Sequence, residues 1–302
     1  MTLGTNILAS QYVTIQDKAQ SLLGTGSGTR GYGQTVQSSD VFTGNTITKA
    51  QWDLIKFDII NIKFHQDGNI PPVVNVNAGD PIGFGASSPN TNYDILLEDA
   101  IVKRFLIAGS QSVTSAKASQ TYSTPWGTQA QATLTVTFGD ANQGRYFFNS
   151  GGKIRFVTSL AGAVSTAQVT AWVNFLNAVG TQSFGADTDP AVNYYTLTNS
   201  YQTYYQNFLS SSYSANSYKL EARTNVADNS TGTATQLEIR VTLLDSYTDP
   251  DVPFTVSHPP GDVVNGTLTI SVSELKASGQ LQPSGTFSIT SPSYSLSGIT
   301  AS

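Results

Sequence analysis

Apolar residues in the first third of the chain recur at steps of three and four, which is the spacing of one helix face. The pattern predicts helices over residues 7–23, 48–68 and 93–107. Thr48 and Gln51 stand at the start of the second helix in the spacing of a capping box, in which each side chain satisfies a backbone N–H of the other residue. Gly24 and Gly109 follow the first and third helices as stop signals.

The second predicted helix is apolar on more than one side. Its main stripe lies on one face, and another group of apolar residues lies off that stripe: Leu54, Phe57 and Ile60. A two-helix hairpin covers only one of these surfaces, and an uncovered apolar patch is typical of an interface. We therefore expect the segment Asn6–Gly68 to pack against another chain or against the β-rich body, and to supply much of the assembly contact. Trp52, Phe57 and Ile60 are the candidate interface residues.

From Gln131 onward the apolar period changes to two. Leu134, Val136 and Phe138 alternate with polar residues, and the same period returns over residues 218–223, 237–243 and 267–272. Such alternation is typical of antiparallel sheets with one face on a core. A hairpin is predicted to turn at residues 149–152, and a fourth helix is predicted over residues 166–179. Residues 110–127 are predicted to form an ordered loop or an edge segment.

These elements together predict an α+β fold. It consists of an N-terminal helical hairpin region followed by an antiparallel β-sandwich-like body with one inserted helix. The expected domains are residues 1–109, which are helical with Gly-rich and Pro-rich linkers, and residues 110–302, which are β-rich with a helix near residues 166–179.

Composition and charge exclude several classes of function and partner. Only 12% of the 302 residues are charged, against about 25% in typical soluble domains, and the formal net charge is −5. Because no basic block exists, nucleic acid is not an expected partner. Without cysteine, disulfides and thiolate metal sites are excluded. No apolar run approaches the roughly 20 residues of a membrane span, so no membrane insertion is expected. A polar, weakly charged surface suits a protein packed against many others, or one that meets sugars.

A glycine-rich stretch raises the question of a nucleotide site. Within residues 24–34, GTGSGTRGYGQ, the residues Gly26, Gly28 and Gly31 have the G-x-G-x-x-G spacing of dinucleotide-binding turns. That motif needs a strand before the glycines and a helix that begins at them. Here a helix precedes the glycines and extended chain follows. The favoured interpretation is a helix stop followed by a flexible glycine linker, and no cofactor is expected.

Histidine and aspartate are the remaining candidates for chemistry. His65 stands at a helix end, where a charged ring would suit the helix dipole, and His258 is far from it in sequence. A structural role is therefore favoured over zinc ligation. Asp245, Asp249 and Asp251 leave three interpretations open: a turn, a calcium site, or a glycosidase acid and base. The Asp-Pro pair favours the turn. No catalytic or metal-binding residue is assigned, and no enzymatic activity is expected.

The stretch from Asn193 to Leu220 is rich in tyrosine. In an extended chain Tyr195, Tyr201 and Tyr205 share one side, and other aromatic residues share the opposite side. Aromatic residues on both sides leave three interpretations open: a core strand, a subunit interface, or a platform for glycan. Tyr195, Tyr201 and Tyr205 are the candidate interface residues of this stretch.

Several strings in the chain resemble virion structural proteins of tailed bacteriophages, especially the large contractile-tailed phages of marine cyanobacteria and their relatives. The strings are NILASQYVTIQDKAQSLLGTGSGTRGYGQTVQSSDV, GNTITKAQWDLIKFDIINIKFHQDG, GRYFFNSGGKIRF and YSANSYKLEAR. The resemblance implies a non-enzymatic particle component in the virion, assembled in the host cytoplasm, whose partners are other virion proteins and copies of itself. Two roles are compatible with it: a tail, neck or baseplate connector or decoration, and a receptor-recognition fibre or collar module that binds host glycan.

Overall fold

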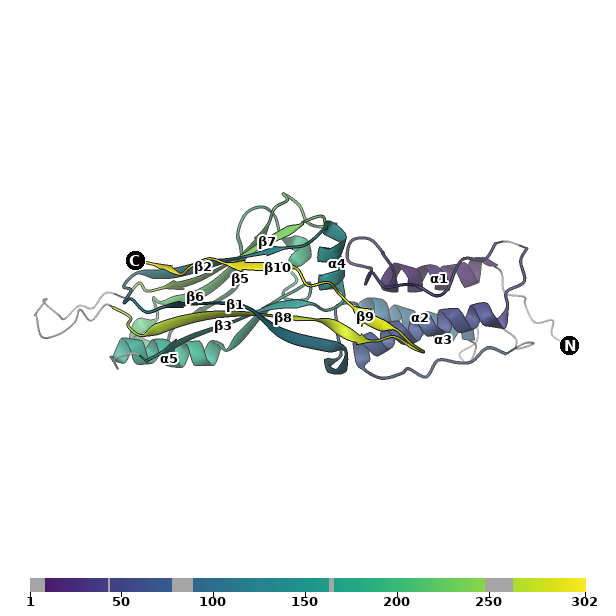
Figure 1. Cartoon of the computed structure of the whole chain (residues 1–302), viewed down its shortest axis with the longest axis horizontal. Coiled ribbons are helices and arrows are strands. Elements are labelled where there is room, and N and C mark those ends of the chain that lie inside the picture. The colour runs from purple at the N-terminus through teal and green to yellow at the C-terminus, as the bar shows by residue number, and fades with distance from the viewer. Residues whose placement is uncertain (1–8, 43, 78–88, 163–165, 248–262) are drawn as a thin grey trace, which may run out of the picture. The chain divides into compact units, whose positions relative to one another are not determined.

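The structure is a computed structural model that describes residues 9–42, 44–77, 89–162, 166–247 and 263–302. The chain divides into two compact units (Figure 1). Unit 1 comprises Met1–Val113, Asp140–Gly152 and Leu275–Ser291, and unit 2 comprises Thr114–Gly139, Lys153–Glu274 and Pro292–Ser302. Whether residues 1–109 form a domain of their own stays a prediction.

In the described ranges, three α-helices precede the first strand, and the other two α-helices lie between strands in the middle of the chain. The helices are α1 (Ala9–Leu23), α2 (Lys49–Asp67), α3 (Pro89–Val102), α4 (Ala141–Asn149) and α5 (Ala167–Val179), with 3₁₀ turns η1 (Gly109–Gln111), η2 (Tyr194–Thr196) and η3 (Ser211–Tyr213). The strands are β1 (Ser112–Tyr122), β2 (Gln129–Thr137), β3 (Lys153–Ala161), β4 (Thr181–Phe184), β5 (Gln202–Phe208), β6 (Ser217–Thr224), β7 (Gln236–Leu244), β8 (Thr267–Gln280), β9 (Thr286–Ser288), β10 (Ser293–Leu296) and β11 (Thr300–Ala301).

Unit 1 contains α1, α2 and α3 packed on one another (Figure 1). The capping box predicted for α2 is present, because Thr48 and Gln51 each satisfy a backbone N–H of the other. The Trp52 ring lies between Tyr12 and Tyr93, with ring centroids 5.4 and 5.5 Å away, in edge-to-face geometry. The third helix covers residues 89–102 rather than the predicted 93–107.

The prediction of a hairpin at residues 149–152 is wrong, because the residues before the turn form helix α4. Asp140 is its N-cap, and its carboxylate accepts a hydrogen bond from the Gln143 backbone N–H at 2.8 Å. Phe147 and Phe148 of this short helix are both fully buried. The aspartate cap with glutamine three residues later is the sequence signal that could have revealed the helix.

Unit 2 is a sandwich of two antiparallel sheets. One sheet has the strand order β1-β8-β3-β4, and the other has the order β10-β2-β7-β6-β5, with β11 also paired to β2. Strand β9 pairs with the end of β8 that belongs to unit 1. Buried and outward residues alternate along β2, β3, β7 and most of β8. This matches the predicted period of two, so the predicted fold class is confirmed. The segment predicted as a loop or edge is the edge strand β1.

The inner faces of the two sheets meet through aromatic and polar contacts. The hydroxyls of Thr158 in β3 and Tyr218 in β6 are 3.1 Å apart, and the rings of Phe184 and Tyr204 are 4.9 Å apart. Helix α5 is the inserted helix that the sequence predicted. Thr166 caps its N-terminus, and Trp172 is fully buried.

Candidate functional site

The candidate interface residues of α2 differ in how far a partner could reach them. Trp52 and Ile60 are 1% and 6% exposed, so they belong to the interior of unit 1. Phe57 is partly exposed and is the one of the three that a partner can contact. On the second apolar side of α2 that the sequence indicated, Ile60 is buried by the chain itself, whereas Leu54 and Phe57 are partly exposed. The interface role of these residues stays a prediction.

The tyrosine-rich stretch is not one continuous strand. Tyr195 is buried in η2, whereas Tyr201 precedes β5 and Tyr205 lies within it, both partly exposed. The pairing of β5 with β6 shifts between Thr203 and Tyr205, as in a β-bulge. Simple alternation could not place these side chains, because the 3₁₀ turn and the shift each change which side a tyrosine takes.

Tyr201 is the centre of a charged cluster on the outer face of the six-stranded sheet. The guanidinium carbons of Arg223 and Arg240 lie 4.5 and 4.1 Å from its ring centroid. Its hydroxyl donates to Glu238 at 2.9 Å. Burial and this hydrogen bond raise the pKa of Tyr201. A sugar stacks on an aromatic ring through an open ring face, so a ring flanked by two guanidiniums is a poor platform for glycan.

Cross-strand ion pairs hold the same cluster together. Arg240 lies opposite Glu221 on the neighbouring strand, and its guanidinium donates to the Glu221 carboxylate at 2.7 Å. Arg223 lies opposite Glu238, and its guanidinium is 2.7 Å from the Glu238 carboxylate. Burial opposes ionisation of Glu221, but hydrogen bonds from Arg240 and Lys219 hold its pKa below the usual value. The charges therefore satisfy one another across β6 and β7, which stabilises the pairing of these strands.

The glycine-rich stretch is an ordered, closely packed loop, so the prediction of a flexible linker is wrong. Arg145 of α4 donates to the Thr25 carbonyl at 2.8 Å. Asn149 of the same helix donates to the carbonyls of Gly28 and Gly31, each at 3.2 Å. The composition of the loop gives no hint of these contacts, because their donors lie more than a hundred residues later in the chain. The predicted helix stop is confirmed, because α1 ends at Leu23 and Gly24 bonds back to Gln20.

Replacing Gly31 with alanine is expected to lower the free energy of unfolding by about 2–4 kcal/mol. Its φ is +99°, and an added Cβ would collide with the backbone oxygen of Thr25. Gly28 is the matched control: its φ is +52°, but an added Cβ would meet nothing within 4 Å, so its alanine variant should lose only about 1 kcal/mol. Urea unfolding of both variants measures the difference. Equal and small losses of unfolding free energy in the two variants would show that the loop backbone adjusts to the added Cβ, and would contradict the close packing at Gly31.

His65 is a buried structural residue at the end of α2. Its Nε2 lies 3.1 Å from the Ser150 carbonyl oxygen, to which it donates, and its ring stacks on Phe287 with centroids 4.1 Å apart. Burial lowers the pKa of His65 to about 3. The ring is neutral at pH 7, so the suggested favourable charge at the helix end does not arise. His258 lies outside the described residues.

Acid should weaken the fold through His65. The unfolded chain takes up a proton near the ordinary pKa of 6.5, whereas the folded chain does so only near 3. The stabilising contribution is therefore complete above the unfolded pKa and is lost as the pH falls, by about 1.4 kcal/mol per pH unit. His65→Phe keeps an aromatic ring beside Phe287 and removes the titration. The stability advantage of wild type over this variant, measured by urea unfolding, should shrink between pH 6.5 and 4. Parallel pH profiles would contradict the assignment.

Only one of the three candidate aspartates lies within the described residues. Asp245 is 4% exposed and accepts a hydrogen bond from Gln168 at 2.6 Å, which ties the start of α5 to the chain after β7. Asp249 and Asp251 lie outside the described residues. Over the ranges that the structure describes, no three His, Asp or Glu side chains are grouped so that they could hold a metal ion. Whether the aspartates bind a cation stays open to test.

Glu274 is a buried carboxylate that the sequence did not single out. Its side chain is fully buried on β8, yet it forms an ion pair with Lys117 of β1 at 2.8 Å and accepts from the Tyr294 hydroxyl at 2.7 Å. Burial and this hydrogen bond raise the pKa of Tyr294. Since Tyr294 lies in β10, the group links the edges of both sheets. An isolated glutamate in an alternating strand gives no sequence signal for such a role.

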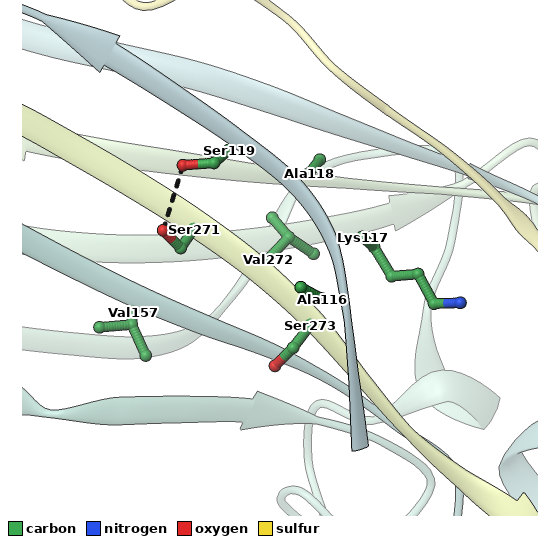
Figure 2. A pocket seen from close by; sticks show the side chains of 8 residues that line it. All are labelled: Ala116, Lys117, Ala118, Ser119, Val157, Ser271, Val272 and Ser273. Carbon is green, nitrogen blue, oxygen red and sulfur yellow. Dashed lines mark hydrogen bonds between the residues drawn. The ribbon is translucent and has the colours of Figure 1, made fainter. Parts of the chain in front are cut away.

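An open hollow of about 370 Å³ lies on β1, β3 and β8 of unit 2 (Figure 2). Small residues line most of it: Ala116, Ala118, Ser119, Ser271 and Ser273. Ser119 and Ser271 bond each other at 3.2 Å across the two strands, and Figure 2 shows the Lys117 side chain directed away from them. The hydroxyls thus satisfy each other, and the hollow holds no convergent set of charged groups.

Comparison of the chain with protein-family models, with curated proteins and with solved structures finds no match. None of the helices in the described ranges combines the length and the apolar composition needed to cross a membrane.

Proposed function

We propose that this chain is a structural component of a tailed-bacteriophage virion, such as a tail, neck or baseplate connector or decoration, and that it acts by multi-copy assembly rather than catalysis. The observation that carries the proposal is a contact between two strings of the stated resemblance. Residues 24–34 of the first string form the glycine loop, and Arg145 and Asn149 of α4, within the string GRYFFNSGGKIRF, donate to its carbonyls. The resemblance therefore includes residues that pack against one another in the fold, although they are far apart in the sequence.

Polar side chains in the interior of both units bond to other parts of the same unit, and this supports the same proposal. Asp58, His65 and Glu274 are buried and each bonds a neighbouring segment of its own unit. Tyr201 contacts Arg223 and Arg240 through its ring and Glu238 through its hydroxyl. Groups in these positions stabilise a rigid body, as an assembly subunit requires, and are not directed toward a substrate. Host glycan is the less favoured partner, because the guanidinium groups of Arg223 and Arg240 already contact the Tyr201 ring.

Deletion of the gene from a phage that encodes the chain tests the proposal. Electron microscopy should show particles that are incomplete at one defined part, and a plasmid copy of the wild-type chain should restore them. Gold-labelled antibody against the chain should then mark that part on wild-type particles. Morphologically complete, infectious particles formed without the chain, and without antibody labelling of the wild type, would overturn the proposal.

A further inference from the structure

The four edge strands of the two sheets differ in how they are protected against pairing with another chain. Natural edges are shielded by shortness, by bulges, or by charged side chains such as lysine. Among the described residues, β4 and β10 are four residues long, and β5 carries the register shift at Thr203. By contrast, β1 has 11 residues and no described strand on its outer side. It is the longest of the four edge strands.

The single charged residue of β1 does not protect this edge. Lys117 is drawn toward the buried Glu274 carboxylate, 2.8 Å from its ammonium, and the ammonium also lies 5.7 Å from the Tyr294 ring centroid. Its side chain is 21% exposed. A lysine that repels a second strand must project into solvent, and this one is neutralised within its own unit. The edge is left with small, uncharged side chains on both sides of Lys117.

The sequence of β1 is nearly the same read in either direction from Lys117. Residues 114–120 are Thr-Ser-Ala-Lys-Ala-Ser-Gln, so alanine flanks the lysine on both sides and serine flanks the alanines. An antiparallel pair of identical strands centred on Lys117 places Ala116 opposite Ala118, and Ser115 opposite Ser119. Small residues then meet small residues at every position next to the centre, and the strands can approach without a clash.

We propose that the outer edge of β1 pairs antiparallel with β1 of a second copy of this chain, about a two-fold axis at Lys117. The partner is fixed by the near-palindrome, because a two-fold contact requires a surface that complements itself. The strand order β4-β3-β8-β1 of one copy then continues into β1 of its partner as a single sheet. The contact gives the proposed virion component a partner, namely a second copy of itself. The pairing itself does not depend on the proposed function, and only its use in particle assembly does.

The two lysines at the axis do not oppose this pairing. Like charges directly opposite each other on paired strands are destabilising. Here each Lys117 forms an ion pair with Glu274 of its own chain, so the net charge of each pair at the contact is close to zero. The backbone N–H and C=O groups on the outer side of β1 would gain partners, which is the main source of affinity in strand addition.

Cysteine crosslinking tests the register, since the natural chain has no cysteine. The double variant Ser115→Cys with Ser119→Cys places each thiol opposite the other in the partner strand. The control Ser119→Cys with Thr121→Cys places the thiols of the two copies at least four residues apart along the strand. After mild oxidation of the purified full-length chain, a crosslinked dimer is expected for the first variant and a monomer for the second. Equal crosslinking of both, or of neither, would overturn the proposed register.

Proline variants test whether the edge itself makes the contact. In an antiparallel strand successive N–H groups point to opposite sides, so Ala118→Pro and Ser119→Pro remove one outward and one inward donor. The variant that keeps the wild-type melting temperature identifies the outward position. Its dimer dissociation constant, from analytical ultracentrifugation, should rise at least about tenfold. A monomeric wild type, or a dimer that this variant leaves intact, would exclude the β1 contact. If the purified chain is monomeric but is present in particles, only the β1 contact is refuted. If the purified chain is dimeric but is absent from particles, the virion role is refuted and the β1 contact stands.

Discussion

Replacing Glu274 with alanine is expected to lower the free energy of unfolding by about 3–5 kcal/mol, because it leaves the partners of a buried ion pair without their counter-charge. Glu274 is fully buried, and its carboxylate joins Lys117 of β1 to Tyr294 of β10. The variant loses at once the ion pair to β1 of its own sheet and the hydrogen bond to β10 of the other sheet. Urea unfolding followed by tryptophan fluorescence measures the loss, since Trp126 and Trp172 are buried in the same unit.

Three further variants separate the contributions to this effect. Glu274→Gln keeps hydrogen-bonding capacity without charge and should cost less than the alanine variant. Tyr294→Phe removes one hydrogen bond and should cost about 1–2 kcal/mol. Lys117→Met leaves the carboxylate without a cation, and the double variant with Glu274→Gln should cost less than the sum of the single changes. Losses below about 1 kcal/mol for Glu274→Ala would contradict the structural role.

Asp58→Ala should destabilise unit 1 by a similar amount, about 3–5 kcal/mol. The carboxylate of Asp58 is fully buried on α2 and accepts from the backbone N–H groups of Gln37 and Ser38, each at 2.9 Å, and from the Ser38 hydroxyl at 2.6 Å. Removing it leaves three donors in a buried site, and an unsatisfied donor costs more than a formed bond contributes. Urea unfolding followed by the fluorescence of Trp52, which lies in the same helix, is the measurement.

Asn at position 58 is the matched control for the charge. Burial raises the pKa of Asp58, with its hydrogen bonds acting in the opposite direction. The contribution of a group with a raised folded pKa is complete below the unfolded pKa and is lost as the pH rises through the folded pKa. The stability of wild type relative to Asp58→Asn should therefore improve as the pH is lowered toward 4. A difference that is constant with pH would show that Asp58 titrates normally.

Features governed by neighbours in the sequence could be predicted. The capping box at Thr48 depends on residues three positions apart, and it is present. The alternation in β7 and β8 reports directly which side of each strand is buried, and the α+β class follows from it. In β6 the same alternation does not do so, because residues on both sides of that strand are buried. Helix α5 was predictable for the same reason, since its cap, its apolar stripe and its stop at Gly180 are all local.

Features governed by distant residues could not be predicted. The polar side of α2 reads as solvent-facing, yet Asn61 bonds the backbone of Gln282, and Asp58 holds residues 37–38. The glycine loop reads as flexible, yet α4 fixes its carbonyls. In each case the partner lies 20 to more than 200 residues away, and local composition carries no information about it. The pairing of Tyr201 with two arginines likewise depends on the registry of β6 and β7.

The most direct test of the account is the amount of this chain in purified virions. Tailed particles from a phage that encodes it are separated on a density gradient and analysed by quantitative mass spectrometry. The account predicts many copies per particle, in a constant ratio to the other structural proteins across preparations. A chain that stays in the soluble fraction of the lysate and is absent from the particles would contradict it.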